Sequence, residues 1–144
     1  MEERLTRPEV REGAFLILFQ TLFGATPEEI EELNAEGFDM RKNAETDEIV
    51  RGVTEHDKEL TEIIAKYSKT RSVARIAKVN MVILKIAAYE MKYCDRVPCA
   101  AAINEAVELA KKYSMKSDSA FINGILNSYM GELNEHNGKQ DKPE

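Results

Sequence analysis

Apolar residues recur at helical spacing along most of this chain. The first such pattern covers residues 8–23, and its apolar face consists of Ala14, Phe15, Leu18 and Leu22. Gly24 follows directly and suits the end of a helix. A short second helix is expected after Thr26, whose hydroxyl suits a helix N-cap. The N-terminal third of the chain is therefore predicted to contain two helices.

A third helical pattern begins near Thr46 or Asp47. The stretch before it, residues 36–45, has no period and is expected to form a loop. The apolar face of the third pattern consists of Ile49, Val53, Leu60, Ile63, Ile64 and Tyr67. Because these positions stay in phase, the pattern predicts one continuous helix.

Residues 76–93 differ because their apolar positions leave little polar surface. Those positions include Val79, Val82, Ile83, Leu84, Ile86, Ala87, Tyr89 and Met91. A helix that is apolar nearly all round is buried among other helices. This segment is therefore expected to be the central helix of the C-terminal half.

Two further helices are predicted between residues 97 and 130. Pro98 suits a first helical turn, and the apolar positions that follow it are Ile103, Ala106, Val107, Ala110 and Tyr113. Ser117, Asp118 and Ser119 can cap the next helix, whose apolar face consists of Phe121, Ile122, Ile125, Leu126 and Tyr129. With no alternating strand pattern in the sequence, the fold class is all-α. We expect a single domain over residues 1–132, with about seven helices in two small bundles around the buried central helix. Residues 133–144 are mostly polar and are expected to form a disordered tail.

Composition and known motifs restrict the possible functions. The chain has 144 residues and a net charge of −6, which opposes unspecific attraction to nucleic acid or anionic lipid. The sequence has no apolar run of membrane-spanning length and no signal peptide, so a cytoplasmic protein is expected. Two cysteines, Cys94 and Cys99, match no common metal or redox spacing and are expected to be structural thiols.

No motif of a catalytic or metal site is present. Phosphate-binding glycine loops, HExxH and GxSxG are all missing, and His56 and His136 are isolated in the sequence. Glu90 and Glu105 lie within apolar helical patterns, where an acid–base pair is conceivable but a structural hydrogen-bonding role is favoured. We therefore expect no enzyme activity, no cofactor and no metal.

Basic residues form local clusters despite the negative net charge. Arg7 and Arg11 lie four positions apart on one helix face, after Arg4 in the N-terminal arm. Two other clusters are Lys66, Lys69, Arg71, Arg75 and Lys78, with no acid among them, and Lys111, Lys112 and Lys116. Guanidinium groups bind phosphate, so these clusters could bind RNA.

An aromatic side chain follows the second lysine cluster closely in the sequence. Phe121 could stack on an unpaired base, with Asp118 and Ser119 bonding to base edges. Spacing alone favours a simpler hypothesis, in which the basic residues are solvated, Phe121 is core and Ser117–Ser119 only caps a helix.

Four segments, in order, resemble the NusB family of bacterial transcription antitermination factors. They are REGAFLILFQ, ARIAKVNMVILKIAAYEM, VPCAAAINEAVELAKKY and SAFINGIL, within residues 7–129. The resemblance implies an all-helical, non-enzymatic protein that binds boxA RNA together with the ribosomal protein NusE. The pair would help RNA polymerase to pass terminators, notably in ribosomal RNA operons.

The resemblance also implies roles for particular residues. Arg7 and Arg11 correspond to RNA-binding arginines, and Asp118, Ser119 and Phe121 lie in the family's RNA-contacting segment. Phe19 and Asn80 correspond to positions near the surface that faces NusE. We add Arg4, Lys112 and Lys116 to the expected RNA-binding residues because of their charge.

Three features depart from the family pattern. Arg7 and Arg11 are separated by three non-basic residues, Arg71 stands where many members have Trp, and Asn80-Met81 replaces an acid and a base. We therefore expect weak RNA binding by the chain alone and dependence on the partner. Two alternatives stay open: a protein–protein adaptor with little RNA binding, and an accessory domain of the kind fused to RNA methyltransferases. A homodimer that covers the arginine face is a further hypothesis.

Overall fold

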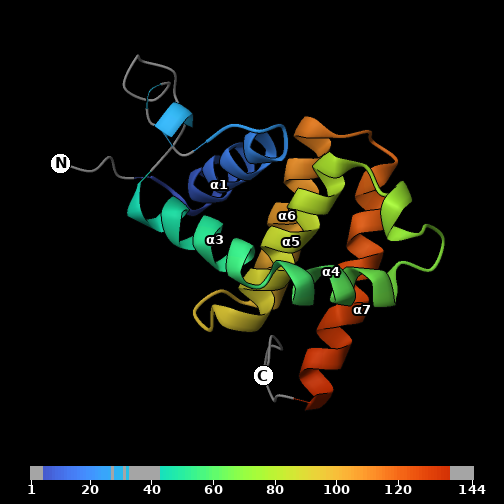
Figure 1. Cartoon of the computed structure of the whole chain (residues 1–144). Coiled ribbons are helices and arrows are strands. Elements are labelled where there is room, and N and C mark those ends of the chain that lie inside the picture. Colours follow the sequence, from blue (N-terminus) through green and yellow to red (C-terminus); the bar gives the residue numbers. More distant parts are fainter. Residues whose placement is uncertain (1–4, 27, 31, 33–42, 137–144) are drawn as a thin grey trace. The chain divides into compact units, whose positions relative to one another are not determined.

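The computed structural model describes residues 5–26, 28–30, 32 and 43–136. These residues form helices joined by turns (Figure 1), and no strand occurs among them, so the predicted all-α class is confirmed. Contacts divide the chain into two compact units, Met1–Glu55 and His56–Glu144. None of the described helices is long and apolar enough to cross a bilayer.

Helix α1, Arg7–Leu22, has well-defined signals at both ends. At its start, Thr6 Oγ1 accepts a hydrogen bond from the Glu9 backbone N–H, and Glu9 Oε1 accepts one from the Thr6 backbone N–H. This reciprocal capping box satisfies two amides that the helix itself cannot pair. At its end, Gly24 adopts a φ of 96°, a left-handed conformation that favours glycine. The predicted stop at Gly24 is confirmed.

The first unit packs α1 against α3, Ala44–Glu55. Asn43 Oδ1 caps α3 by accepting hydrogen bonds from the amides of Glu45 and Thr46. The helix therefore begins two to three residues before the predicted start. Residues 28–30 and 32 are also helical, and a second capping box between Thr26 and Glu29 confirms the predicted cap. Ile17 and Ile30 form a small buried cluster in this unit.

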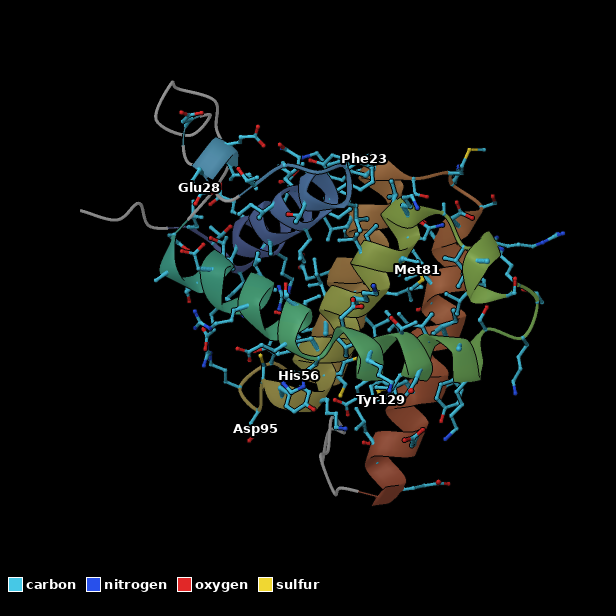
Figure 2. All side chains as sticks on the ribbon, viewed as in Figure 1. Phe23, Glu28, His56, Met81, Asp95 and Tyr129 are labelled. Atoms are coloured by element: carbon cyan, nitrogen blue, oxygen red, sulfur yellow. The ribbon has the colours of Figure 1, made fainter. Side chains whose placement is uncertain are left out.

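The prediction of one continuous helix over Ile49–Tyr67 is wrong, because the helix is interrupted at His56. Helix α4, Asp57–Tyr67, begins directly after this residue, which has φ −108° and ψ 20°. The imidazole of His56 stacks on the Tyr93 ring, with 4.2 Å between centroids, and its Nδ1 lies 3.5 Å from Glu59 Oε1. Figure 2 labels His56 at this break, which coincides with the boundary between the two units.

The second unit is built around helix α5, Lys78–Tyr93, which contacts α4, α6 and α7. Helix α6, Cys99–Tyr113, and helix α7, Asp118–His136, lie beside it (Figure 1), and a single 3₁₀ turn, η1, spans Val73–Arg75. Most of α5 is buried, as the sequence predicted, and its core residues include Ile83, Leu84, Ala88 and Met91. Short connections place the start of α5, the end of α6 and the start of α7 at one end of this unit.

Polar contacts join α4 to the neighbouring helices of the second unit. Lys66 Nζ lies 3.0 Å from Glu132 Oε1 on α7, and the Tyr67 hydroxyl donates to the same carboxylate. Glu59 accepts hydrogen bonds from Lys92 and Tyr93 on α5. Because α4 buries few apolar side chains, these contacts help to fix its position.

The predicted tail begins too early. Helix α7 continues to His136, and Leu133 is only 2% exposed. Helix α7 therefore extends four residues past the predicted boundary at residue 132, and Leu133 adds one more buried apolar side chain. The remainder of the expected tail, residues 137–144, lies outside the described residues, and so does Arg4.

Candidate nucleic-acid interface

The two arginines of α1 have different environments. Arg7 is half-buried, and its Nη1 lies 3.3 Å from Glu45 Oε2 at the start of α3. Arg11 is buried, with an exposed fraction of 4%. Burial leaves Arg11 little surface for a phosphate, and its expected RNA-binding role stays a prediction. A phosphate that approaches Arg7 must compete with the carboxylate of Glu45.

A buried carboxylate stands where α5, α6 and α7 meet. Asp118, the first residue of α7, is 8% exposed. Its oxygens lie 3.2 Å from Arg71 Nη2 and 3.0 Å from the Ser114 hydroxyl. The same hydroxyl lies 2.8 Å from Asn80 Oδ1, and since it has one proton it donates to one of these acceptors at a time. Asp118 is therefore not exposed for contact with base edges, contrary to the role expected for it.

The surroundings of Asp118 stabilise its charged form. The Asn80 amide, the Ser114 hydroxyl and the Arg71 guanidinium together hold the pKa of Asp118 below its usual value, while burial acts in the opposite direction. Asn80 has the largest influence, although its Nδ2 makes no hydrogen bond of ordinary geometry; we therefore attribute its effect on the pKa to proximity of the amide dipole. Asp118 is an ionised anchor at neutral pH.

Arg71 connects this anchor to an aromatic ring. Its guanidinium carbon lies 4.0 Å from the centroid of the Phe121 ring, over the ring face. The Arg71 carbonyl also accepts a hydrogen bond from the Ser68 hydroxyl. Phe121 is half-buried and is thus neither a bare stacking surface nor a fully buried core residue. Both sequence hypotheses for Phe121 missed that an arginine 50 positions earlier covers it.

Lysines and arginines surround this end of the second unit. Those that are exposed and form no ion pair in the described part of the chain are Lys69, Arg75, Lys78 and Lys116. Lys112, also exposed, has its Nζ 5.5 Å from the Tyr113 ring centroid. The expected roles of Lys112 and Lys116 are thus consistent with their exposure. Lys69, Arg75 and Lys78 were recognised as a basic cluster but not counted among the expected RNA-binding residues, because sequence spacing does not show which end of the helices they occupy.

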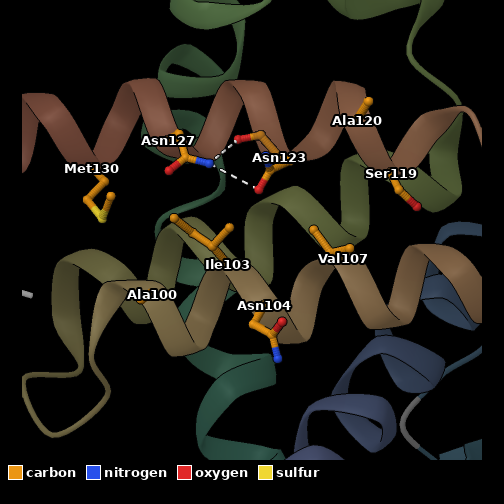
Figure 3. Close-up of a pocket in the computed structure, with 9 residues that line it drawn as sticks. All are labelled: Ala100, Ile103, Asn104, Val107, Ser119, Ala120, Asn123, Asn127 and Met130. Carbon is orange, nitrogen blue, oxygen red and sulfur yellow. Dashed lines mark hydrogen bonds between the residues drawn. The ribbon is translucent and has the colours of Figure 1, made fainter.

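Ser119 lies at the edge of a groove between α6 and α7. The groove has a volume of about 480 Å³ and is lined mainly by apolar and asparagine side chains, among them Ile103, Val107, Asn123 and Asn127 (Figure 3). The Ser119 hydroxyl is buried and has no hydrogen-bond partner. No charged residue lines the groove, so nothing in it specifically attracts a phosphate.

The two expected partner-facing residues also differ. Asn80 is fully buried in the Asp118 network, so the expectation that its side chain faces a partner is wrong. Phe19 is half-buried and packs edge-to-face against Phe23, with 5.1 Å between centroids. Phe23, labelled in Figure 2, is 66% exposed and Leu22 is 49% exposed, so the end of α1 presents an apolar surface. Leu22 was expected on the apolar face of this helix.

The groups that were considered for catalysis or metal binding are dispersed. Glu90 is fully buried in α5, and Glu105 is half-buried in α6. Cys94 and Cys99 are free thiols. Among the described residues, no group of three or more His, Cys, Asp or Glu side chains is placed to hold a metal ion.

Comparison with known proteins gives a consistent result. The model of the NusB family matches residues 8–130. A transcription antitermination protein NusB from Agathobacter rectalis is 35% identical over 127 residues, which cover 85% of this chain and 97% of that protein. A NusB structure from T. maritima superposes with a TM-score of 0.75 at 27% identity, covering 90% of this chain and 94% of that one. A crystal structure of antitermination factors NusB and NusE in complex with dsRNA gives a TM-score of 0.73 at 26% identity, covering 88% of this chain and 96% of that chain.

Proposed function

The chain belongs to the NusB family, and from this premise we propose that it acts as a transcription antitermination factor. In this proposal it binds boxA-type RNA together with NusE, in the cytoplasm, and supports transcription of ribosomal RNA operons. It acts by binding, with no chemical step of its own. RNA polymerase is then its indirect partner, through the assembled antitermination complex.

One observation carries the proposal: the similarity extends over nearly the whole chain and nearly the whole of its relatives. A relative named as an antitermination protein is covered to 97%, and one chain of a NusB–NusE–dsRNA crystal structure is covered to 96%. A match confined to one helix pair would indicate a shared fold only. Here 85–90% of this chain corresponds, which supports a shared function.

Charge distribution supports a local RNA site rather than general affinity. The net charge is −6, yet four cations in the segments that lead to or follow Arg71 and precede Asp118 are exposed and form no ion pair with a described residue: Lys69, Arg75, Lys78 and Lys116. Each phosphate contact adds to affinity and to its salt dependence. Among the described cations of the first unit, Arg7 is paired to Glu45 and Arg11 is buried, which leaves Arg51 exposed on α3. We therefore expect weak binding by the chain alone and tighter binding with NusE.

A second candidate function is a protein–protein adaptor with little RNA binding. The apolar surface formed by Leu22 and Phe23 favours this alternative, because large exposed side chains often mark partner sites. A homodimer that covers the α1 arginines is a separate hypothesis. Size-exclusion chromatography that shows a monomer at all concentrations would exclude it.

The proposal is tested by fluorescence anisotropy with a labelled boxA RNA and a scrambled RNA of equal composition. Both are titrated with this protein, with and without NusE, at two salt concentrations. We expect tighter binding to boxA, a further increase with NusE and a decrease at higher salt. Equal, weak binding to both RNAs despite a stable complex with NusE would overturn RNA recognition and favour the adaptor.

A further inference from the structure

We infer that Arg71 is a direct RNA-binding residue, which presents its guanidinium to an unpaired base and its free N–H groups to a phosphate. Phe121 and Asp118 then hold Arg71 in place and do not themselves contact RNA. This inference rests on the proposed function for the identity of the RNA. It differs from the expected roles of Asp118 and Phe121, which placed both in contact with RNA.

Two contacts from α7 fix the Arg71 side chain. Asp118 accepts a hydrogen bond from Nη2 at 3.2 Å, and the Phe121 ring lies 4.0 Å below the guanidinium carbon. A carboxylate and an aromatic face restrict both the position and the tilt of a planar guanidinium. The side chain is therefore ordered before RNA binds, so binding costs less conformational entropy.

The anchor is itself fixed from two other helices. Asp118 is 8% exposed, and it is held by the Ser114 hydroxyl at the end of α6, beside Asn80 at the start of α5. The low pKa that these neighbours give Asp118 keeps the carboxylate charged. Arg71 thus rests on a site to which three helices contribute.

Part of the Arg71 side chain remains available to a ligand. Its side chain is 33% exposed, while that of Asp118 is 12% exposed. A guanidinium has five N–H donors, and Asp118 uses one of those on Nη2. Guanidinium planes stack on bases as well as on aromatic rings, so a base can cover the face opposite Phe121. The exposed Lys69, Arg75 and Lys116 near this end of the unit suit the adjoining phosphates.

The charge of Arg71 alone does not explain this arrangement. Arg75 is an exposed arginine four positions later, with neither an aromatic ring beneath it nor an ion pair among the described residues. If only positive charge mattered, the two arginines would contribute equally to RNA affinity. The planar contact predicts that Arg71 contributes more, and that lysine cannot replace it.

The test compares Arg71→Lys with Arg75→Lys, a matched pair that conserves charge. Each full-length variant, in complex with NusE, is titrated against labelled boxA RNA and against RNAs with an abasic site at each position in turn. We expect Arg71→Lys to weaken boxA binding about tenfold and Arg75→Lys to change it less than about twofold. One abasic substitution should weaken the wild type while leaving Arg71→Lys unaffected. Circular dichroism and NusE binding should be unchanged in both variants.

A second variant tests whether Phe121 acts through Arg71. Introduced into the wild type, Phe121→Leu should weaken RNA binding. Introduced into Arg71→Lys, it should cause little further loss of RNA affinity. Additive losses would show that Phe121 contacts RNA directly and would overturn the inference. The inference would also be overturned if Arg71→Lys bound RNA with an affinity within about twofold of the wild type. The stacking contribution of one base to affinity is larger than that factor.

Failure of the proposed function gives a different pattern. If the wild type binds boxA and scrambled RNA equally but Arg71→Lys weakens both, Arg71 contacts unpaired RNA and only the boxA assignment fails. If the wild type binds neither RNA with NusE present, both the function and this inference are overturned.

Discussion

Arg7, in the first turn of α1, forms an ion pair with Glu45, in the first turn of α3, with 3.3 Å between Nη1 and Oε2. Both side chains are more than a third exposed, so the pair adds little to stability. If Arg7 binds RNA as proposed, the pair matters more for RNA affinity, because Glu45 neutralises the arginine that is most accessible on α1. Glu45 therefore competes with phosphate for Arg7.

Glu45→Gln should raise RNA affinity by about twofold to fivefold at low salt and less at high salt. The free energy of unfolding should change by less than ~0.5 kcal/mol, because the ion pair is exposed. Anisotropy titrations and urea denaturation measure these effects. Glu55→Gln is the control, because it makes the same charge change on α3 without an ion pair to Arg7. Equal gains from both variants would show that only net charge matters.

Asp118→Asn should destabilise the second unit at neutral pH. The variant keeps the shape of the side chain but weakens the charge-assisted hydrogen bonds from Arg71 and Ser114, a loss of about 1–3 kcal/mol in the free energy of unfolding. Denaturation with urea at pH 7 measures the loss. Asp57→Asn, which breaks an exposed ion pair with Lys85, should cost under ~1 kcal/mol.

The difference in stability between the wild type and Asp118→Asn should depend on pH in a predictable way. The pKa of Asp118 is lower in the folded protein than its ordinary value of 3.8, so its stabilising effect is complete above that value. It disappears as the pH falls through the folded pKa. The difference in stability between wild type and Asp118→Asn should therefore be constant near neutral pH and shrink below about pH 4. A difference that grows toward acid would contradict the depressed pKa.

Much of the fold could be predicted because burial follows local apolar spacing. Segment 76–93 is apolar nearly all round, and α5 is the buried centre of its unit. Gly24 and Thr26 carry local end signals that the structure confirms. The break at His56 carried no such signal, since no glycine or proline marks it. Val53 and Leu60 are seven positions apart, so the apolar period passes through the break unchanged.

The candidate site was less predictable because its contacts are not local. Asp118 and Arg71 are 47 positions apart, and no helical spacing relates them. A serine–aspartate–serine run is a sound cap signal, but it does not show that the carboxylate also pairs across the fold. Likewise, the spacing of Arg7 and Arg11 placed both on one face without showing that Arg11 is buried. Spacing identifies a face of a helix but not what covers that face.

Leu133→Ala tests whether the folded part extends past residue 132. Leu133 is 2% exposed, so shortening its side chain to that of alanine should lower the free energy of unfolding by about 2–4 kcal/mol. Asn134→Ala, at the exposed neighbouring position, should change it by less than ~0.5 kcal/mol. Thermal or urea unfolding measures both variants. Equal, small effects would show that the last turns of α7 add nothing to the core.

Phe23→Ala tests the apolar surface at the end of α1. The ring is 66% exposed and lies edge-on to Phe19, so the fold should lose less than ~1 kcal/mol. Affinity for NusE should fall about tenfold if this surface binds the partner. Isothermal titration with purified NusE measures this change. Met115→Ala removes a side chain of similar exposure from the second unit and should leave NusE affinity unchanged. If Phe23→Ala bound NusE with the same affinity as the wild type, NusE would contact a different surface.

Terminator read-through tests the antitermination function most directly. Purified RNA polymerase transcribes two templates, one with an intact boxA and one with boxA scrambled, each followed by the same terminator. This protein is added with NusE and the other elongation factors, and the long and short transcripts are quantified. We predict more read-through on the boxA template only, and a smaller gain with Arg71→Lys. Equal read-through on both templates, with or without this protein, would contradict its assignment as an antitermination factor.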